Sequence, residues 1–302
     1  MTTSPIPAGA SNQALVAWAA EGLIDPLGRA LAAAVRWWPL PGLAGEWPVA
    51  VLGQGPPLLL LHGFDSSFLE FRRLAPLLAG NHTLIIPDLH GFGFCPRADG
   101  ASQGPAPVLA HLEALLQRLA ADHPHPVGVI GASMGGSVAV VLARSRPERV
   151  ERLLLLAPAG LTGRPMPLPP LLDGLGVRFL ALEGVRRGLC RSAFADPDTA
   201  VGPAELEIAC LHLRSPGWAA ALARFARSGG FAGCGDPLPP QPLHVLWGAD
   251  DRILRPPQKR AAEARLGSRL ELVERCGHLP HLDQPALVAQ RWRHWPGEPA
   301  LG

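Results

Sequence analysis

The sequence predicts an α/β protein in which helices flank both faces of a mainly parallel sheet. Short, mainly apolar runs recur along the 302 residues, and most of them end at glycine, proline or a reactive polar residue. Such runs are typical of strands buried on both faces of a parallel sheet. Segments with helical periodicity lie between most of the runs, which is the signature of parallel strands joined by helices.

The expected elements follow one another in a regular order. The first strand, at residues 47–52, meets the turn Gly-Gln-Gly-Pro-Pro and should end in a hairpin. Six buried strands are expected after it, at residues 58–61, 83–86, 127–130, 153–156, 243–247 and 270–273. Helices are expected at residues 68–78, 107–121, 137–144, 258–265 and 285–295.

Two segments stand outside this alternation. Residues 1–46 should form an N-terminal helical extension, since residues 12–38 are apolar and predict two short helices broken near Pro26. We expect these helices to pack on the core or to cover the site, with peripheral contact to a membrane surface as the alternative. Residues 161–240 carry no buried-strand pattern between Pro-rich borders and predict a helical cap, or lid, inserted into an α/β core of residues 47–160 and 241–302.

Composition and charge limit the possible partners and location. The formal charge is only +2 and the basic residues are scattered, which argues against nucleic acid as a partner. No apolar run is long enough for stable membrane insertion, and the N-terminus lacks the basic stretch of a secretory signal. Five cysteines without a CxxC pair predict free thiols in a reducing cytoplasm, and no pattern predicts a metal, a cofactor or an oligomeric state.

The strongest local motif is Gly131-Ala132-Ser133-Met134-Gly135-Gly136, which follows an expected strand and opens an expected helix. Glycines two residues before and two after a serine permit a very tight strand-to-helix turn that exposes the hydroxyl. The helix N-terminus behind the serine offers free N–H groups to a developing negative charge. The motif therefore predicts a nucleophilic serine at position 133.

A serine hydroxyl needs a base and an orienting acid to become a good nucleophile. Two later strands end in loops that carry these groups: Asp250 and Asp251 in one, His278 and His281 in the other. The two loops follow the serine in the chain order Ser, Asp, His. Because parallel strands end at a common edge of the sheet, all three loops should lie side by side. Only one aspartate and one histidine can complete such an arrangement.

At these residues the chain resembles the α/β-hydrolase superfamily, in particular its lid-bearing branch of serine esterases and lipases. The matching pieces, in the family's order, are His62-Gly63-Phe64, the stretch from Pro87 to Gly93, the serine motif, the stretch from Gly248 to Asp251, and Gly277-His278. The resemblance implies an α/β-hydrolase fold with an eight-stranded, mainly parallel sheet and an inserted helical lid. Cys95 departs from the pattern, since the family usually has serine there.

The resemblance also implies a role for each matching residue. Ser133 would be the nucleophile, Asp251 the orienting acid and His278 the general base. The backbone N–H groups of Phe64 and Met134 would form the oxyanion hole. Asp251 is favoured over Asp250 and His278 over His281 by the family's spacing.

These residues predict a serine hydrolase that cleaves a carboxylic ester, or a similar acyl bond, of a small apolar molecule through an acyl-enzyme. Haloalkane dehalogenases and epoxide hydrolases are disfavoured, because they use a carboxylate nucleophile and the chain has no tyrosine for epoxide opening. Three alternatives stay open: a carbon–carbon bond hydrolase, a perhydrolase on the same triad, and a non-catalytic binding protein of this fold.

The remaining polar residues allow simpler interpretations. His62 should hydrogen-bond within its loop to hold the oxyanion hole, with a second base as the alternative. Asp88 should brace its own loop, and His111 should lie at the surface or in a loop. Arg186, Arg187 and Arg191 fit a solvated helix face better than a site for a substrate carboxylate or phosphate. The apolar residues of the insertion either line a pocket or form its own core: Leu171, Leu172, Phe179, Leu180, Trp218 and Phe225.

Overall fold

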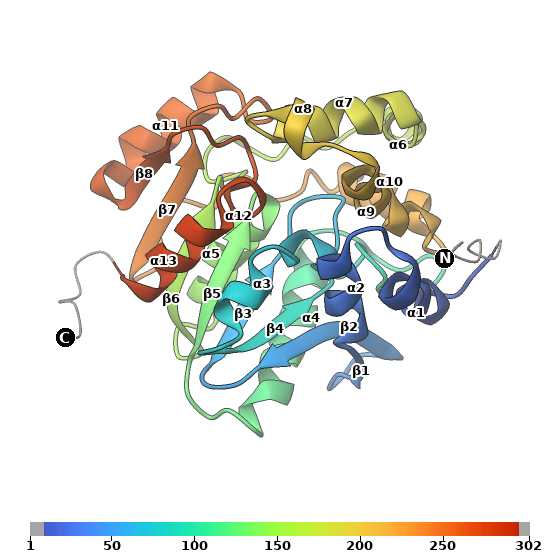
Figure 1. Ribbon diagram of the computed structural model, residues 1–302, viewed down its shortest axis with the longest axis horizontal. Coiled ribbons are helices and arrows are strands. Elements are labelled where there is room, and N and C mark those ends of the chain that lie inside the picture. The colour runs from blue at the N-terminus through green and yellow to red at the C-terminus, as the bar shows by residue number, and fades with distance from the viewer. Residues whose placement is uncertain (1–8, 296–302) are drawn as a thin grey trace.

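A computed structural model of the chain describes residues 9–295 (Figure 1). Its centre is an eight-stranded sheet with the order β1-β2-β4-β3-β5-β6-β7-β8. The strands from β3 to β8 run parallel, and β2 is antiparallel to both of its neighbours. The strands are β1 (Val35–Pro39), β2 (Glu46–Gly53), β3 (Pro57–Leu61), β4 (Thr83–Pro87), β5 (Val127–Ala132), β6 (Val150–Leu156), β7 (Leu243–Gly248) and β8 (Leu270–Val273). This sheet confirms the predicted fold class and all seven expected strands.

Helices cover both faces of the sheet because successive side chains of the buried strands point to opposite sides. Leu59 and Val129 face one apolar cluster, and Leu58 and Ile130 face the other. The first cluster is completed by α4 (Pro105–Ala120), α5 (Met134–Ser145) and α11 (Pro256–Leu266). The second is completed by α1 (Asn12–Gly22), α2 (Pro26–Ala33), α3 (Ala75–Leu78) and α13 (Pro285–Arg293). Short helical turns η1 (Phe68–Phe71), η3 (Gly267–Arg269) and α12 (Pro280–Asp283) link these elements.

The expectation for residues 1–46 is correct in its helices and wrong at its end. Helices α1 and α2 are present, and the break falls at Pro26, which is the first residue of α2. Residues 35–39, however, form β1 and pair with β2 from Val35 opposite Ala50 to Pro39 opposite Glu46. The hairpin therefore lies before β2, because β3 enters the sheet between β4 and β5. Residues 1–8 of the expected extension lie outside the described residues.

The segment between β6 and β7 is helical, as its periodicity predicts. It contains α6 (Pro170–Leu180), α7 (Glu183–Ala193), α8 (Pro197–Ala200), α9 (Pro203–Leu211), η2 (His212–Arg214) and α10 (Trp218–Arg227). In Figure 1 these helices, drawn in yellow and gold, lie together above one end of the sheet. We call residues 161–240 the insertion. Among residues 9–295, no helix is long and apolar enough to cross a lipid bilayer.

Candidate active site

Ser133 lies at the junction of β5 and α5, in the conformation that its glycine neighbours permit. Its backbone has φ 50° and ψ −118°, a region that is strained for any residue with a side chain. A Cβ on Gly131 would overlap the backbone of Gly135, and one on Gly135 would overlap the carbonyl of Leu61. Glycine is therefore required at both positions for β3, β5 and α5 to approach each other around the serine.

The structure brings the three residues of the expected triad together. His278 Nε2 lies 2.9 Å from Ser133 Oγ, and His278 Nδ1 lies 2.9 Å from Asp251 Oδ2. The other carboxylate oxygen of Asp251 accepts the backbone N–H groups of Ile253 and Leu254 at 2.8 and 3.0 Å. The side chain of Asp251 is only 1% exposed. These bonds hold the carboxylate, the imidazole and the hydroxyl in one line.

The surroundings of Asp251 keep it ionised. Burial would raise its pKa, but the hydrogen bond to His278, the charge of His278 and two backbone N–H bonds lower the pKa below its ordinary value. The neighbouring Asp250 is exposed and makes no contact of this kind. The geometry therefore agrees with the choice of Asp251 over Asp250.

The two amides expected to form an oxyanion hole flank the serine. The N–H of Met134 is the first of helix α5, where N–H groups have no acceptor within the helix. Phe64 follows Gly63, whose Cα approaches the serine so closely that an added Cβ would lie 3.3 Å from Ser133 Cβ. We call residues 62–67, which follow β3, the oxyanion loop.

The ring of His62 holds the oxyanion loop in place by hydrogen bonds, as expected. Its Nδ1 lies 2.8 Å from the carbonyl oxygen of Gly63, and its Nε2 accepts the N–H of Leu89 at 2.9 Å. Complete burial lowers the pKa of His62 to about 4, so the ring is neutral at pH 7 and donates through Nδ1. This neutral, fully bonded ring argues against a second base.

Asp88 braces the next loop, also as expected. Its two oxygens each accept a backbone N–H at 2.6 Å, from Phe68 and Phe94. Burial raises its pKa to about 7, although those two N–H bonds act in the opposite direction. Cys95 donates its Sγ hydrogen to the Asp88 carbonyl at 3.2 Å. Cys95, the residue that departs from the family pattern, therefore makes a structural contact.

One buried pair beneath the oxyanion loop was not predicted from the sequence. Glu70 Oε1 lies 3.0 Å from His281 Nε2, and both carboxylate oxygens lie within 3.4 Å of the Gly63 nitrogen. Burial would raise the pKa of Glu70, but His281, through a hydrogen bond and its charge, lowers it to about 2. His281 thus lies against the carboxylate that holds the oxyanion loop. The sequence signal that could have indicated a buried, paired carboxylate was the charged Glu70 inside the apolar run Phe68-Leu69-Glu70-Phe71.

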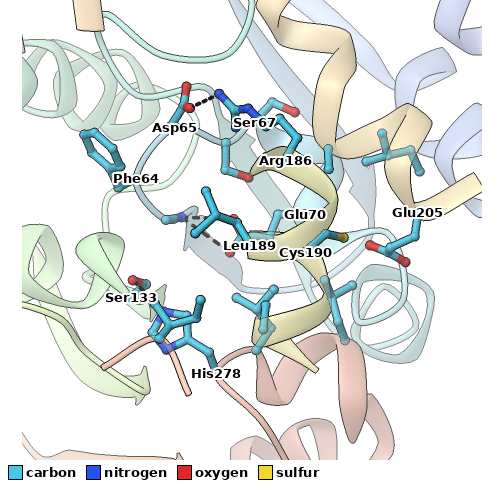
Figure 2. A pocket seen from close by; sticks show the side chains of 18 of the residues that line it. Phe64, Asp65, Ser67, Glu70, Ser133, Arg186, Leu189, Cys190, Glu205 and His278 are labelled. Carbon is cyan, nitrogen blue, oxygen red and sulfur yellow. Dashed lines mark hydrogen bonds and ion pairs between the residues drawn. The ribbon is translucent and has the colours of Figure 1, made fainter. Parts of the chain in front are cut away.

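A cavity of about 270 Å³ opens beside Ser133 and His278 (Figure 2). The oxyanion loop forms one wall, and helices α7 and α9 of the insertion form another. Apolar side chains of the insertion and of the loop that carries His278 line it: Leu180, Leu189, Phe194, Ile208 and Leu279. The loop of the base is tied to the same wall, since the N–H of His278 donates to Ala193 O at 2.8 Å.

Each charged side chain lining this cavity has a partner of opposite charge or a histidine. Asp65 binds Arg186, as the dashed line in Figure 2 marks, and Glu205 binds Arg72. Glu70 binds His281. The solvated-face interpretation is wrong for Arg186, which is only 9% exposed because it turns inward to Asp65. It holds for Arg187 and Arg191, whose half-exposed side chains pair with Glu183 and Asp198.

A second cavity, of about 280 Å³, lies on the other side of the oxyanion residues. Phe64 lines both cavities, and Met134 lines the second one together with Phe225 and Phe231. The Phe64 ring lies 5.7 Å from Phe92 and 5.9 Å from Phe225, centre to centre. Of the apolar residues singled out in the insertion, Leu180 and Phe225 thus line cavities. The side chains of Leu171 and Leu172 lie outside the described residues.

Comparisons with known proteins agree with this arrangement. A family model described as the alpha/beta hydrolase family matches residues 58–291. The alpha/beta hydrolase domain-containing protein VTE7 of Arabidopsis thaliana is 30% identical over 288 residues, which cover 89% of this chain and 86% of that protein. A 2-hydroxy-6-oxo-2,4-heptadienoate hydrolase of Pseudomonas putida is 33% identical over 114 residues, 37% of this chain and 40% of that protein. A solved thermophilic esterase from Thermogutta terrifontis has a TM-score of 0.64 and 25% identity, covering 86% of this chain and 97% of that one.

Proposed function

The chain belongs to the α/β hydrolase family, and we propose that it is a serine hydrolase that cleaves a carboxylic ester of an uncharged, apolar molecule. One observation carries this proposal: an unbroken chain of contacts from Asp251 through His278 to Ser133, at the wall of a largely apolar cavity. We propose the cytoplasm as its location, because all five cysteines are free thiols.

In the proposed reaction Ser133 Oγ attacks the ester carbonyl while His278 Nε2 takes the hydroxyl proton. Nδ1–H of His278 donates to Asp251, whose buried carboxylate stabilises the imidazolium. The N–H groups of Phe64 and Met134 donate to the tetrahedral oxyanion. His278 then protonates the leaving alkoxide, and an acyl-enzyme forms on Ser133. Water, deprotonated by His278, attacks the acyl carbon and releases the acid.

The charged side chains of the first cavity determine which substrate charge it favours. Its cations, Arg72 and Arg186, already pair with carboxylates at close range. A substrate anion would have to compete with those internal partners, and burying an unpaired charge is costly. A dienoate, which is the substrate named for the Pseudomonas relative, carries such a negative charge. We therefore favour a neutral ester over carbon–carbon bond cleavage of an anion.

The intact contacts of the site also weigh against a non-catalytic binding protein. Ser133 is held in a strained backbone conformation beside a base at hydrogen-bonding distance. Strain of this kind costs about 1–3 kcal/mol and is maintained at sites that use it. A binding protein would gain nothing from that cost.

Hydrolysis of p-nitrophenyl esters of increasing acyl length tests the proposal. We expect turnover by the wild-type protein, covalent labelling of Ser133 by a fluorophosphonate, and the loss of both in Ser133→Ala. Ser145→Ala is the matched control, because Ser145 lies at the far end of the same helix and its hydroxyl donates to Leu142 O. Absence of both turnover and labelling in the wild type would refute the serine hydrolase. Faster turnover of a dienoate than of any ester would refute the choice of substrate.

A further inference from the structure

Large apolar side chains are exposed on one part of the insertion. Six of them lie between residues 166 and 189: Met166, Leu168, Leu175, Phe179, Leu182 and Leu189. Met166 is 80% exposed, Leu175 61% and Phe179 59%. Single exposed apolar residues are ordinary, but a concentration of them marks an interaction surface. We call these six residues the lid face.

The lid face is built to present these side chains outward. Leu175, Phe179 and Leu182 are spaced by four and three residues, which places them on one side of α6 and its C-terminal turn. The opposite side of α6 holds Val177, which is buried in the core. Pro165, Pro167 and Pro169 precede α6 and restrict the backbone that carries Met166 and Leu168.

Three side chains of the lid face line the two cavities. Met166 and Leu168 line the second cavity, and Leu189 lines the first. Because these same side chains are exposed to solvent, each cavity reaches the surface at the lid face. A protein or a second copy seated there would close both entrances. A lipid surface would cover the same side chains and also supply an apolar ester.

The charge around the lid face has the sign that suits an anionic surface. Residues 164–189 contain four arginines and two acidic residues, a formal charge of +2, which equals the charge of the whole chain. Of these charges, Arg186 is buried against Asp65 and Asp173 is buried against Arg227. The exposed Glu183 pairs with Arg187, which leaves Arg164 and Arg178 as exposed positive charges. Exposed arginines among apolar side chains are typical of protein surfaces that bind anionic lipid.

We propose that the lid face docks on an anionic lipid surface and that the substrate is an apolar ester dissolved in that lipid. The identity of the substrate rests on the proposed function, whereas the docking does not. When the lid face is buried in the lipid interface, Met166, Leu168 and Leu189 connect the lipid to the two cavities. The ester can then reach Ser133 without crossing water.

Binding to vesicles tests the docking independently of catalysis. The probes are vesicles of phosphatidylcholine alone and of an equal mixture with phosphatidylglycerol, in a sedimentation assay at low and high salt. We expect stronger binding to the anionic vesicles and weaker binding at high salt. The triple variant Leu175→Ser, Phe179→Ser, Leu182→Ser should bind about 100-fold more weakly, because three apolar side chains no longer enter the lipid. None of the three lines a cavity, so hydrolysis of a soluble p-nitrophenyl ester should be unchanged.

The double variant Ile24→Ser, Leu27→Ser is the matched control, since these side chains are 56% and 40% exposed on the N-terminal segment. It should bind vesicles like the wild type. The docking is overturned if the wild type binds neither kind of vesicle or if the triple variant binds as well as the wild type. It is also overturned if the control variant, and not the triple variant, loses binding. Concentration-dependent dimerisation that the triple variant abolishes would assign the lid face to a second copy. Failure of ester hydrolysis alone, with vesicle binding intact, would refute only the proposed function.

Discussion

One peptide group decides whether the proposed oxyanion hole can work, and His62 bonds its carbonyl oxygen. The carbonyl of Gly63 and the N–H of Phe64 belong to the same trans peptide and point in opposite directions. His62 Nδ1 bonds that carbonyl at 2.8 Å, so the Phe64 N–H at the opposite edge of the peptide points away from His62. Replacing His62 by phenylalanine keeps the ring volume but removes this donor and the acceptor for Leu89 N–H.

The expected losses follow from those two bonds. Losing one hydrogen bond and leaving the Leu89 N–H buried without a partner should lower the free energy of unfolding by about 2–4 kcal/mol. A hydrogen bond of ~1 kcal/mol changes the fraction of correctly oriented peptide about fivefold, and complete loss of one oxyanion donor costs about 100- to 1000-fold in kcat. We therefore expect kcat of His62→Phe to fall by about fivefold, well short of complete loss of the donor, with KM nearly unchanged because the donor acts in the transition state.

Steady-state hydrolysis of a p-nitrophenyl ester, together with urea unfolding, measures both effects. The matched control is His111→Phe. Contrary to the expectation of a surface or loop position, His111 is buried in α4. Its ring lies 4.6 Å from Trp47 and has no hydrogen-bond partner among the described residues. The His111→Phe variant should keep the kcat of the wild type. If His62→Phe is folded and its kcat lies within twofold of the wild type, the peptide is not held by His62 and the reasoning fails.

Three further outcomes follow from the site. The folded-state pKa of His62 is lowered to about 4, so its contribution to stability is present above its ordinary pKa of about 6.5 and is lost as the pH falls towards 4. The difference in unfolding free energy between wild type and His62→Phe should shrink across that window, and a constant difference would contradict it. Asp251→Asn should lower kcat about 10⁴-fold with little change in KM, because the imidazolium loses its buried carboxylate; an equal effect on a folded Asp250→Asn would argue against that assignment. Gly135→Ala should destabilise the fold by about 3 kcal/mol, measured by urea unfolding, because its Cβ overlaps the Leu61 carbonyl.

The sheet and the serine turn could be predicted because their signals are local. A strand buried on both faces must be apolar throughout, and β3, β5 and β7 are fully buried. The glycines around Ser133 are required by backbone contacts that any strand-to-helix turn of this kind makes. The proximity of Ser133, Asp251 and His278 then follows from the common edge at which parallel strands end.

Strand β1 could not be predicted because it lies at the edge of the sheet. None of its residues from Val35 to Pro39 is fully buried, so it lacks the continuous apolar run that marks the central strands. Its sequence Val-Arg-Trp-Trp-Pro continues the apolar stretch of α1 and α2 without a turn signal. Only the pairing with β2, which is a tertiary contact, makes it a strand.

The ionic contacts of the site could not be predicted for a related reason. Glu70 and His281 are 211 positions apart, and Asp65 and Arg186 are 121 positions apart. Helical periodicity places Arg186 on a face of α7 but says nothing about what that face meets. A buried arginine and a solvated one therefore look alike in the sequence, and only the fold separates Arg186 from Arg187.

Asp65 shows why the insertion and the oxyanion hole must act together. It follows Phe64 directly, and its carboxylate bonds Arg186 of α7, His212 of η2 and Trp218 of α10. Burial would raise its pKa, but His212, Arg186 and Trp218 hold the pKa well below its ordinary range, so the carboxylate stays charged. A displacement of any of these elements would break a bond to a buried charge, at a cost of several kcal/mol. The position of the insertion is thereby coupled to the backbone next to the Phe64 N–H, which is one of the two donors of the proposed oxyanion hole.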